Sequence, residues 1–206
     1  MGELKHTVPA GFGTKGERRG EDRTKTTVYR PILFRTGDLA GFCLLRDLSP
    51  GGMMGVAYTT LASAQPITIE FHPEHRVPGM IAWSREERIG VRFDAEIDVA
   101  QTIAILGRTH AEGWIKRAPR LALECSGEAV VGDKTLPFRL DDISQRGARL
   151  ELQGVKPGEE VSIKLPGLEP HKAVVRWVRE GKTGLNFLRP YGLEELARWA
   201  IARQTG

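Results

Sequence analysis

The residues best suited to chemistry in this sequence are arginines near the N-terminus. The segment RRGEDR contains Arg18, Arg19 and Arg23, and the last two are four residues apart. A guanidinium group is a planar fork that can bind a phosphate, contact the O6 and N7 edge of guanine, or stack on a base. Taken alone, the segment could equally be a solvated charged tail. The residues that follow it decide between these two interpretations.

A second pattern, D-x-S-x-x-G, occurs twice, as DLSPGG at residues 47–52 and as DISQRG at residues 142–147. Either copy alone predicts only a tight turn, because Asp and Ser side chains bond to nearby backbone and Gly tolerates a positive φ. The pattern consists of Asp47, Ser49 and Gly52 in the first copy and Asp142, Ser144 and Gly147 in the second. The repetition indicates that each turn belongs to a larger duplicated unit.

Two further landmarks recur with the turn in the same order. W-x6-G-(V/L)-x-F follows each copy, starting at Trp83 and at Trp177, and a basic cluster precedes each copy. In the second half that cluster is KRAPR, residues 116–120. Three landmarks at nearly one offset predict an internal repeat. The two tryptophans are most simply predicted to be core residues of equivalent strands.

The segments between the landmarks have the character of β-strands. Runs such as PITIEF, IGVRF, ARLELQ and AVVRWV alternate in polarity, are rich in β-branched residues and are separated by Gly and Pro. Each half is therefore predicted to be a small antiparallel barrel or sandwich. Helical spacing follows in DAEIDVAQTIAILGRTHAEGW, which Asp94 could cap, and in GLEELARWAIARQ. The inner face of the first helix is predicted to carry Ile97, Ala100, Ile103, Ala104 and Ala111. The predicted fold class is mainly β, with two tandem small antiparallel β-barrels, each followed by an amphipathic α-helix.

These elements predict four segments along the chain. We expect a flexible N-terminal tail at residues 1–16, a first domain at 17–94, a connecting helix at 95–113 and a second domain at 114–206. No low-complexity linker separates the two halves, so we expect the domains to pack against each other.

Composition excludes several classes of protein. A length of 206 residues with 40% hydrophobic content is sufficient for real cores, and a net charge of +4 is small for a protein that grips long nucleic acid. The two cysteines form no C-x-x-C pair, which fits a reducing compartment. No apolar run approaches the roughly 20 residues needed to span a bilayer, and no signal peptide is evident. A soluble cytoplasmic protein is expected.

Three motifs with chemical potential have simpler explanations. GFGTKG at residues 11–16 fits a dinucleotide fingerprint, but no strand precedes it. The segment 127–135 resembles a phosphate loop, yet Gly132 and Asp133 favour a hairpin turn. His72 and His75 flank Pro73 and Glu74, which favour an exposed hairpin over a metal site. No nucleophile with its base and no metal set is apparent, so we expect a protein that is not an enzyme and has no metal or cofactor.

The basic cluster, the D-x-S-x-x-G turn and the W…G-x-x-F pattern together closely resemble the PilZ domain family, receptors for the bacterial messenger cyclic di-GMP. The resemblance covers about residues 17–94 and 114–190 and is complete in the first half. It implies that Arg19 and Arg23 clamp phosphates and guanines and that Arg18 adds a phosphate contact. It further implies that Asp47 accepts hydrogen bonds from guanine, that Ser49 orients the loop, and that Gly52 leaves clearance for a base.

The second half departs from this pattern at its first arginine. The resemblance implies a second set of ligand residues, namely Lys116, Arg117, Arg120, Asp142, Ser144 and Gly147. Lysine keeps the charge but lacks the bidentate fork and the flat stacking face. We therefore predict that the first domain is the high-affinity site and that the second is weaker or purely structural.

The leading hypothesis is a cyclic di-GMP effector that relays the signal to a downstream protein partner. One alternative is a PilZ-like scaffold that binds a protein and has lost the ligand. Another is an RNA-binding barrel, which the modest charge and the lack of an evident aromatic stacking platform make less favoured. Nucleic acid is therefore an unlikely partner.

Overall fold

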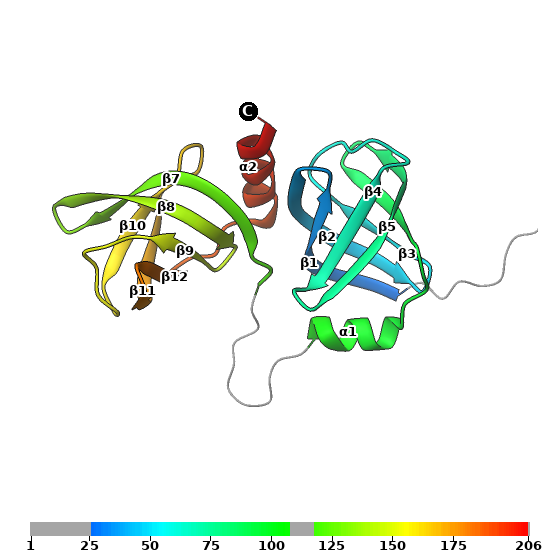
Figure 1. Ribbon diagram of the computed structural model, residues 1–206, viewed down its shortest axis with the longest axis horizontal. Coiled ribbons are helices and arrows are strands. Elements are labelled where there is room, and N and C mark those ends of the chain that lie inside the picture. The colour runs from blue at the N-terminus through cyan, green and yellow to red at the C-terminus, as the bar shows by residue number, and fades with distance from the viewer. Residues whose placement is uncertain (1–25, 108–117, 206) are drawn as a thin grey trace, which may run out of the picture.

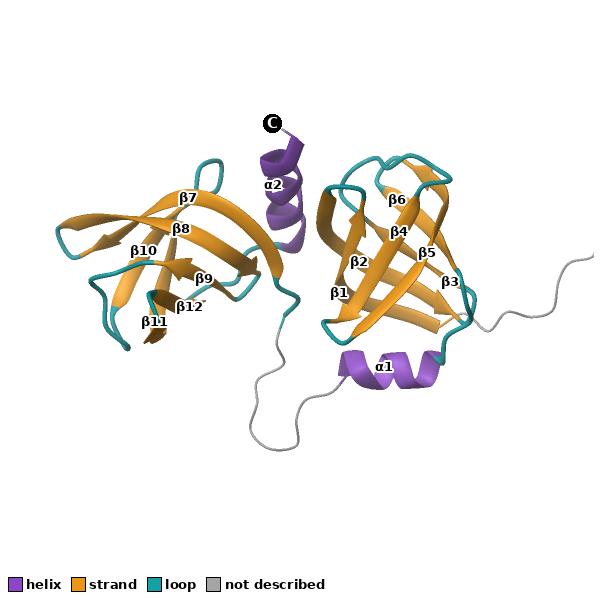
Figure 2. Ribbon diagram, in the orientation of Figure 1, coloured by secondary structure: helices purple, strands orange, loops and turns teal. Residues whose placement is uncertain are grey.

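The computed structural model describes residues 26–107 and 118–205 (Figure 1). The predicted tail, the GFGTKG motif and five predicted ligand residues lie outside this part of the chain; the five are Arg18, Arg19, Arg23, Lys116 and Arg117. The described residues form two separate β-barrels and two α-helices (Figure 2). Neither helix is long and apolar enough to cross a membrane.

Barrel 1 is a closed antiparallel barrel with the strand order β1-β2-β3-β6-β5-β4. Its strands are β1 (Thr26–Thr36), β2 (Leu39–Ser49), β3 (Gly52–Val56), β4 (Pro66–His72), β5 (His75–Arg85) and β6 (Arg88–Phe93). Alternation along each strand sends one set of side chains inward, and Phe34, Leu45, Ile69 and Ile81 are fully buried there. The side chains that point outward are available to form a binding site.

Barrel 2 repeats this architecture with the order β10-β11-β12-β9-β8-β7. Its strands are β7 (Leu121–Val131), β8 (Lys134–Ser144), β9 (Gly147–Glu151), β10 (Glu160–Lys164), β11 (His171–Arg179) and β12 (Lys182–Phe187). Leu140, Ile143 and Ile163 have the core roles in this barrel. Strands β7, β8 and β9 lie 95 residues after β1, β2 and β3, so the internal repeat and the predicted fold class are confirmed.

The two hairpins that resembled other motifs are ordinary turns. Gly132 links β7 to β8 with φ +56°, a left-handed conformation that glycine adopts without strain. His72 and His75 flank the β4–β5 turn, and His75 forms a hydrogen bond with Thr102 at 3.1 Å. Within residues 26–107 and 118–205, no cluster of three or more metal-ligating side chains occurs.

The two cysteines differ in burial. Cys43 is fully buried, and this burial raises the pKa of its thiol to about 12. Cys125 is only half-buried, and both cysteines are free.

Helix α1 (Val99–Gly107) follows barrel 1 and lies across one end of it (Figure 1). The sequence suggested Asp94 as its cap, and this was wrong. Asp98 is the cap, because the Gln101 N–H donates to its Oδ1 at 2.9 Å. Asp94 instead continues the backbone hydrogen bonding between β6 and β5, since its N–H donates to the Pro78 carbonyl. Of the residues predicted on the inner face of this helix, Ala111 lies outside the described residues.

Helix α2 (Leu193–Thr205) follows barrel 2 and lies between the two barrels (Figure 1). Leu196, Trp199 and Ala200 are buried in the core cluster of barrel 2, and the Trp199 indole N–H donates to the Pro166 carbonyl at 2.8 Å. The helix therefore belongs to barrel 2, whose core it completes.

The opposite side of α2 contacts barrel 1. Ile201 packs against the core of barrel 1, and the Gln204 side-chain amide accepts from the Ala40 N–H at 3.0 Å and donates to the Ala40 carbonyl at 2.8 Å. Arg198 forms a two-pronged ion pair with Glu87. Phe42 of β2 in turn joins the core cluster of barrel 2. The expected packing of one domain against the other is confirmed.

Candidate functional site

The D-x-S-x-x-G aspartates reach the outer surface because of a β-bulge. On β2, Leu45 pairs with Gly55 and Asp47 with Met54, so Arg46 is an extra residue without a partner on β3. A bulge turns two consecutive side chains to the same face. Arg46 and Asp47 are accordingly both partly exposed, between the buried Leu45 and Leu48.

Barrel 2 repeats the bulge one repeat later. Leu140 pairs with Leu150 and Asp142 with Arg149, which leaves Asp141 as the extra residue on β8. Each barrel thus presents two adjacent side chains where strict alternation would present one.

The serine of the motif closes the turn. The Ser49 hydroxyl donates to the Gly52 carbonyl at 3.1 Å, and the Ser144 hydroxyl donates to the Gly147 carbonyl at the same distance. The two turns are therefore built in the same way. Any contact between Ser49 and a ligand remains a prediction.

The glycine of the motif is required by the barrel itself. A Cβ atom on Gly52 would lie 2.3 Å from the Val91 carbonyl oxygen of β6, and one on Gly147 would lie 2.1 Å from the Leu185 carbonyl oxygen of β12. Both obstacles are backbone atoms, which cannot rotate away. A structural need for glycine therefore exists independently of the clearance for a base that the sequence analysis assigned to Gly52.

The two motif aspartates differ in their partners. The Thr27 hydroxyl donates to Asp47 Oδ1 at 3.2 Å, and no described cation forms an ion pair with Asp47. Asp142 is only 8% exposed and is held by Arg120 Nη1 at 2.6 Å and by Arg149 Nη2 at 3.0 Å. The structure thus brings Arg120 and Asp142 together, but as an ion pair with each other.

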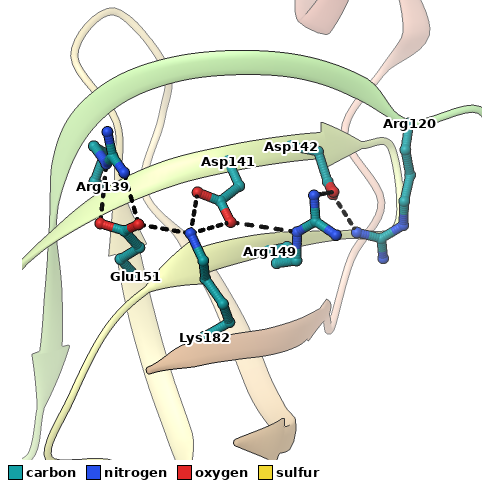
Figure 3. Close-up of polar contacts among 7 residues, drawn as sticks. All are labelled: Arg120, Arg139, Asp141, Asp142, Arg149, Glu151 and Lys182. Atoms are coloured by element: carbon teal, nitrogen blue, oxygen red, sulfur yellow. Dashed lines mark hydrogen bonds and ion pairs between the residues drawn. The ribbon is translucent and has the colours of Figure 1, made fainter. Parts of the chain in front are cut away.

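Asp142 lies next to one end of a chain of alternating charges on the outer face of barrel 2, which we call the ion ladder (Figure 3). In order, the ladder consists of Arg139, Glu151, Lys182, Asp141, Arg149, Asp142 and Arg120. Lys182 Nζ lies 2.6 Å from Glu151 Oε1 and 2.8 Å from Asp141 Oδ2. Every carboxylate in the ladder has at least two cationic partners.

The ladder makes the stability of barrel 2 dependent on pH. Hydrogen bonds from Arg139 and from Lys182 lower the pKa of Glu151 from 4.5 to about 2. A carboxyl whose pKa is lower in the folded state stabilises that state above its unfolded pKa and loses this effect as the pH falls through the folded pKa. We therefore expect the wild type to have a higher melting temperature than Glu151→Gln at pH 7, with the gap shrinking between pH 4.5 and 2. Thermal unfolding of both proteins at several pH values measures the gap, and a gap independent of pH would contradict the assignment.

The repeated tryptophans lie on the outer surface, so the prediction that they are core residues was wrong. Trp83 is 37% exposed and lies over its cross-strand partner Gly90, where a Cβ would be 2.1 Å from the indole nitrogen. Trp177 covers Gly184 in the same way. The cause is a second bulge, between Ile81 and Trp83. Without it, strict alternation would point Trp83 into the barrel like Ile81. The W-x6-G spacing marks an aromatic side chain covering a glycine across a hairpin.

Sequence reasoning missed five of the seven residues of the ion ladder, namely Arg139, Asp141, Arg149, Glu151 and Lys182. When the two halves are aligned, the corresponding residues of the first half are, in the same order, Leu44, Arg46, Met54, Val56 and Arg88. The two halves share the motifs but differ in charge at these positions.

The fold and the motifs together define a protein of two tandem β-barrels, each with one outward-facing D-x-S-x-x-G turn. Residues 17–109 and 115–201 each match the PilZ domain, and the chain belongs to this family. No curated protein matches the chain in sequence.

Several solved structures are weakly similar to this chain. The PlzA protein of Borreliella burgdorferi, in complex with c-di-GMP, is 10% identical with a TM-score of 0.38, over 92% of this chain and 95% of its own. YcgR of Escherichia coli, in complex with c-di-GMP, is 14% identical with a TM-score of 0.36, over 84% and 83%. The inhibitor of motility MotI of Bacillus subtilis is 12% identical with a TM-score of 0.34, over 87% and 98%. At these values the similarity does not bear on what this chain binds.

Proposed function

We propose that this protein is a non-enzymatic receptor for cyclic di-GMP and that its binding site is on barrel 1. The observation that carries the proposal is the contrast between the two motif aspartates. Asp47 is partly exposed on barrel 1 with no cationic partner among the described residues, whereas Asp142 is neutralised by Arg120 and Arg149. Only barrel 1 therefore presents a carboxylate ready to accept hydrogen bonds from a ligand.

The chemistry of the ligand fits this surface. Cyclic di-GMP carries two guanines, whose N1 and N2 donors match a carboxylate, and two phosphates, which match guanidinium groups. Arg18, Arg19 and Arg23 supply those groups in the proposal. Arg23 precedes Thr26 by three residues, so chain connectivity keeps it within about 11 Å of the start of β1. Thr27 pairs with Asp47, which places the start of β1 beside the motif.

Binding would be relayed by a change at the surface of barrel 1. In this proposal the Arg18–Arg23 segment closes over the ligand at the motif. Strand β2 carries Asp47 and Ser49 at one end and Ala40 and Phe42, which contact α2 and barrel 2, toward the other. A change at the motif therefore has a continuous strand along which to reach the second domain. The receptor would act in the bacterial cytoplasm on a downstream protein partner.

Calorimetric titration of cyclic di-GMP into the full-length protein tests this function, with the Arg19→Ala, Arg23→Ala double variant as the control. We expect the wild type to bind and the double variant to lose binding, because both guanidinium forks are removed. A stoichiometry that corresponds to one occupied barrel would locate the site in domain 1. A wild type that gives no heat and does not compete with a labelled ligand would contradict the proposal.

The ion pairs of Asp142 favour a second function for barrel 2, that of a protein-interaction scaffold. Its motif carboxylate is engaged within the ion ladder, so a guanine would have to displace Arg120 and Arg149 before binding. The buried face of helix α2 and the contact with barrel 1 support a structural role for this domain. Equal binding at both barrels in the same titration would exclude this division of roles.

A further inference from the structure

The residue before the motif aspartate has opposite charge in the two barrels. The bulge brings Arg46 to the outer face beside Asp47, and it brings Asp141 to the equivalent place beside Asp142. Barrel 1 therefore presents a cation next to its motif carboxylate, and barrel 2 presents a second anion. The positions correspond by register, since Arg46 and Asp141 are the extra residues of the same bulge.

Arg46 is held in place by an aromatic ring and not by an acid. Its guanidinium carbon lies 4.4 Å from the centroid of the Tyr29 ring, and its Nη2 donates to the Tyr29 hydroxyl at 3.0 Å. Among the ion pairs of the described residues, none involves Arg46. Tyr29 is 59% exposed, so the stacked pair lies open to solvent on the outer face. A guanidinium fixed in this way keeps donors free and loses little freedom when it binds an anion.

Asp141 is the opposite case. Its carboxylate lies 2.8 Å from Lys182 Nζ and 3.4 Å from Arg149 Nε (Figure 3). Arg120, Arg149 and Lys182, the cations in contact with the two aspartates, are thus already neutralised by acids of the ladder. In barrel 1 the positions of Arg139, Arg149 and Glu151 are taken by apolar residues, namely Leu44, Met54 and Val56. Of the three acids of the ladder, only the motif aspartate has a counterpart in barrel 1, namely Asp47, and Arg46 forms no ion pair with it.

We infer that the bulge residue decides which barrel accepts the anionic dinucleotide. Arg46, stacked on Tyr29, binds a phosphate of the ligand beside the guanine that Asp47 holds. Asp141 repels that phosphate in barrel 2 and occupies the cations that could have bound it. This inference rests on the proposed function, because the ligand is the one proposed there. It assigns a specificity-determining residue that lies outside the arginine cluster and outside D-x-S-x-x-G.

The test is calorimetric titration of cyclic di-GMP into full-length wild type, Arg46→Gln and Arg46→Asp. We expect Arg46→Gln to weaken binding by about tenfold to hundredfold, because a charge-assisted contact is lost. Arg46→Asp, which copies the charge of barrel 2, is expected to weaken it further. Arg46 is partly exposed at the surface, so both variants are expected to unfold at nearly the wild-type temperature, and a thermal melt checks this.

The matched control is Arg35→Gln. Arg35 lies on β1 eight residues beyond Thr27, roughly 26 Å along the strand, and its substitution removes the same charge from the same barrel. It is expected to bind like the wild type. If wild type binds and Arg46→Gln binds no more weakly than Arg35→Gln, the role of Arg46 is overturned while the receptor function stands. If the wild type itself does not bind, both proposals are overturned.

Discussion

Replacing Asp47 by alanine is expected to weaken cyclic di-GMP binding by about 100-fold or more. The reason is that a carboxylate accepting from both N1 and N2 of a guanine makes two charge-assisted hydrogen bonds, each worth about 1.5–3 kcal/mol. The only described hydrogen bond to the Asp47 side chain comes from the exposed Thr27 hydroxyl, so the fold loses little. Calorimetric titration of the full-length variant measures the effect.

Asp142→Ala is the matched control for this prediction, since it removes the same atoms at the same place in the repeat. It is expected to leave ligand binding unchanged and to lower the melting temperature, because Arg120 and Arg149 lose their shared carboxylate. The opposite pattern, with binding lost in Asp142→Ala and kept in Asp47→Ala, would move the site to barrel 2.

Gly52→Ala is expected to have the largest effect on stability, a loss of about 3 kcal/mol in the free energy of unfolding. The new Cβ would lie 2.3 Å from the Val91 carbonyl oxygen, and only a shift of β3 away from β6 relieves the clash. That shift weakens the pairing of β3 with β6, in which Gly52 lies opposite Arg92. Urea denaturation of the full-length protein measures the loss.

The neighbouring Gly51 provides a control within the same turn. A Cβ atom on Gly51 would meet no atom within 4 Å, so Gly51→Ala is expected to change the free energy of unfolding by no more than about 0.5 kcal/mol. Similar losses in the two variants would mean that glycine is needed here for the turn and not for the approach of β6.

The repeat, the strands and the helices were predictable because they depend on short-range patterns. Alternating side chains along 5–11 residues and a turn motif copied at one offset predicted two barrels, and the structure has them. Helix α1 was predicted with the wrong cap, because Asp94 and Asp98 both precede the helix. Only the structure shows that Asp94 continues the backbone hydrogen bonding of the barrel and that Asp98 caps the helix. The candidate ligand residues of D-x-S-x-x-G were identified, but their surroundings were not.

The sequence by itself determined that this protein contains two PilZ-like barrels, because strand alternation, turn glycines and helical spacing are local properties of the chain. Only the tertiary structure decided which face of the barrel the side chains of Trp83 and Arg46 lie on. Each orientation depends on a β-bulge, which is one extra residue in a pair of strands, and no residue pattern in the sequence marks where the bulge falls. It also decided that Asp142 is neutralised and Asp47 is not. Those partners are Arg120, just before β7, Arg149 of β9 and Thr27 of β1, and only the pairing of the strands brings them beside the motif aspartates.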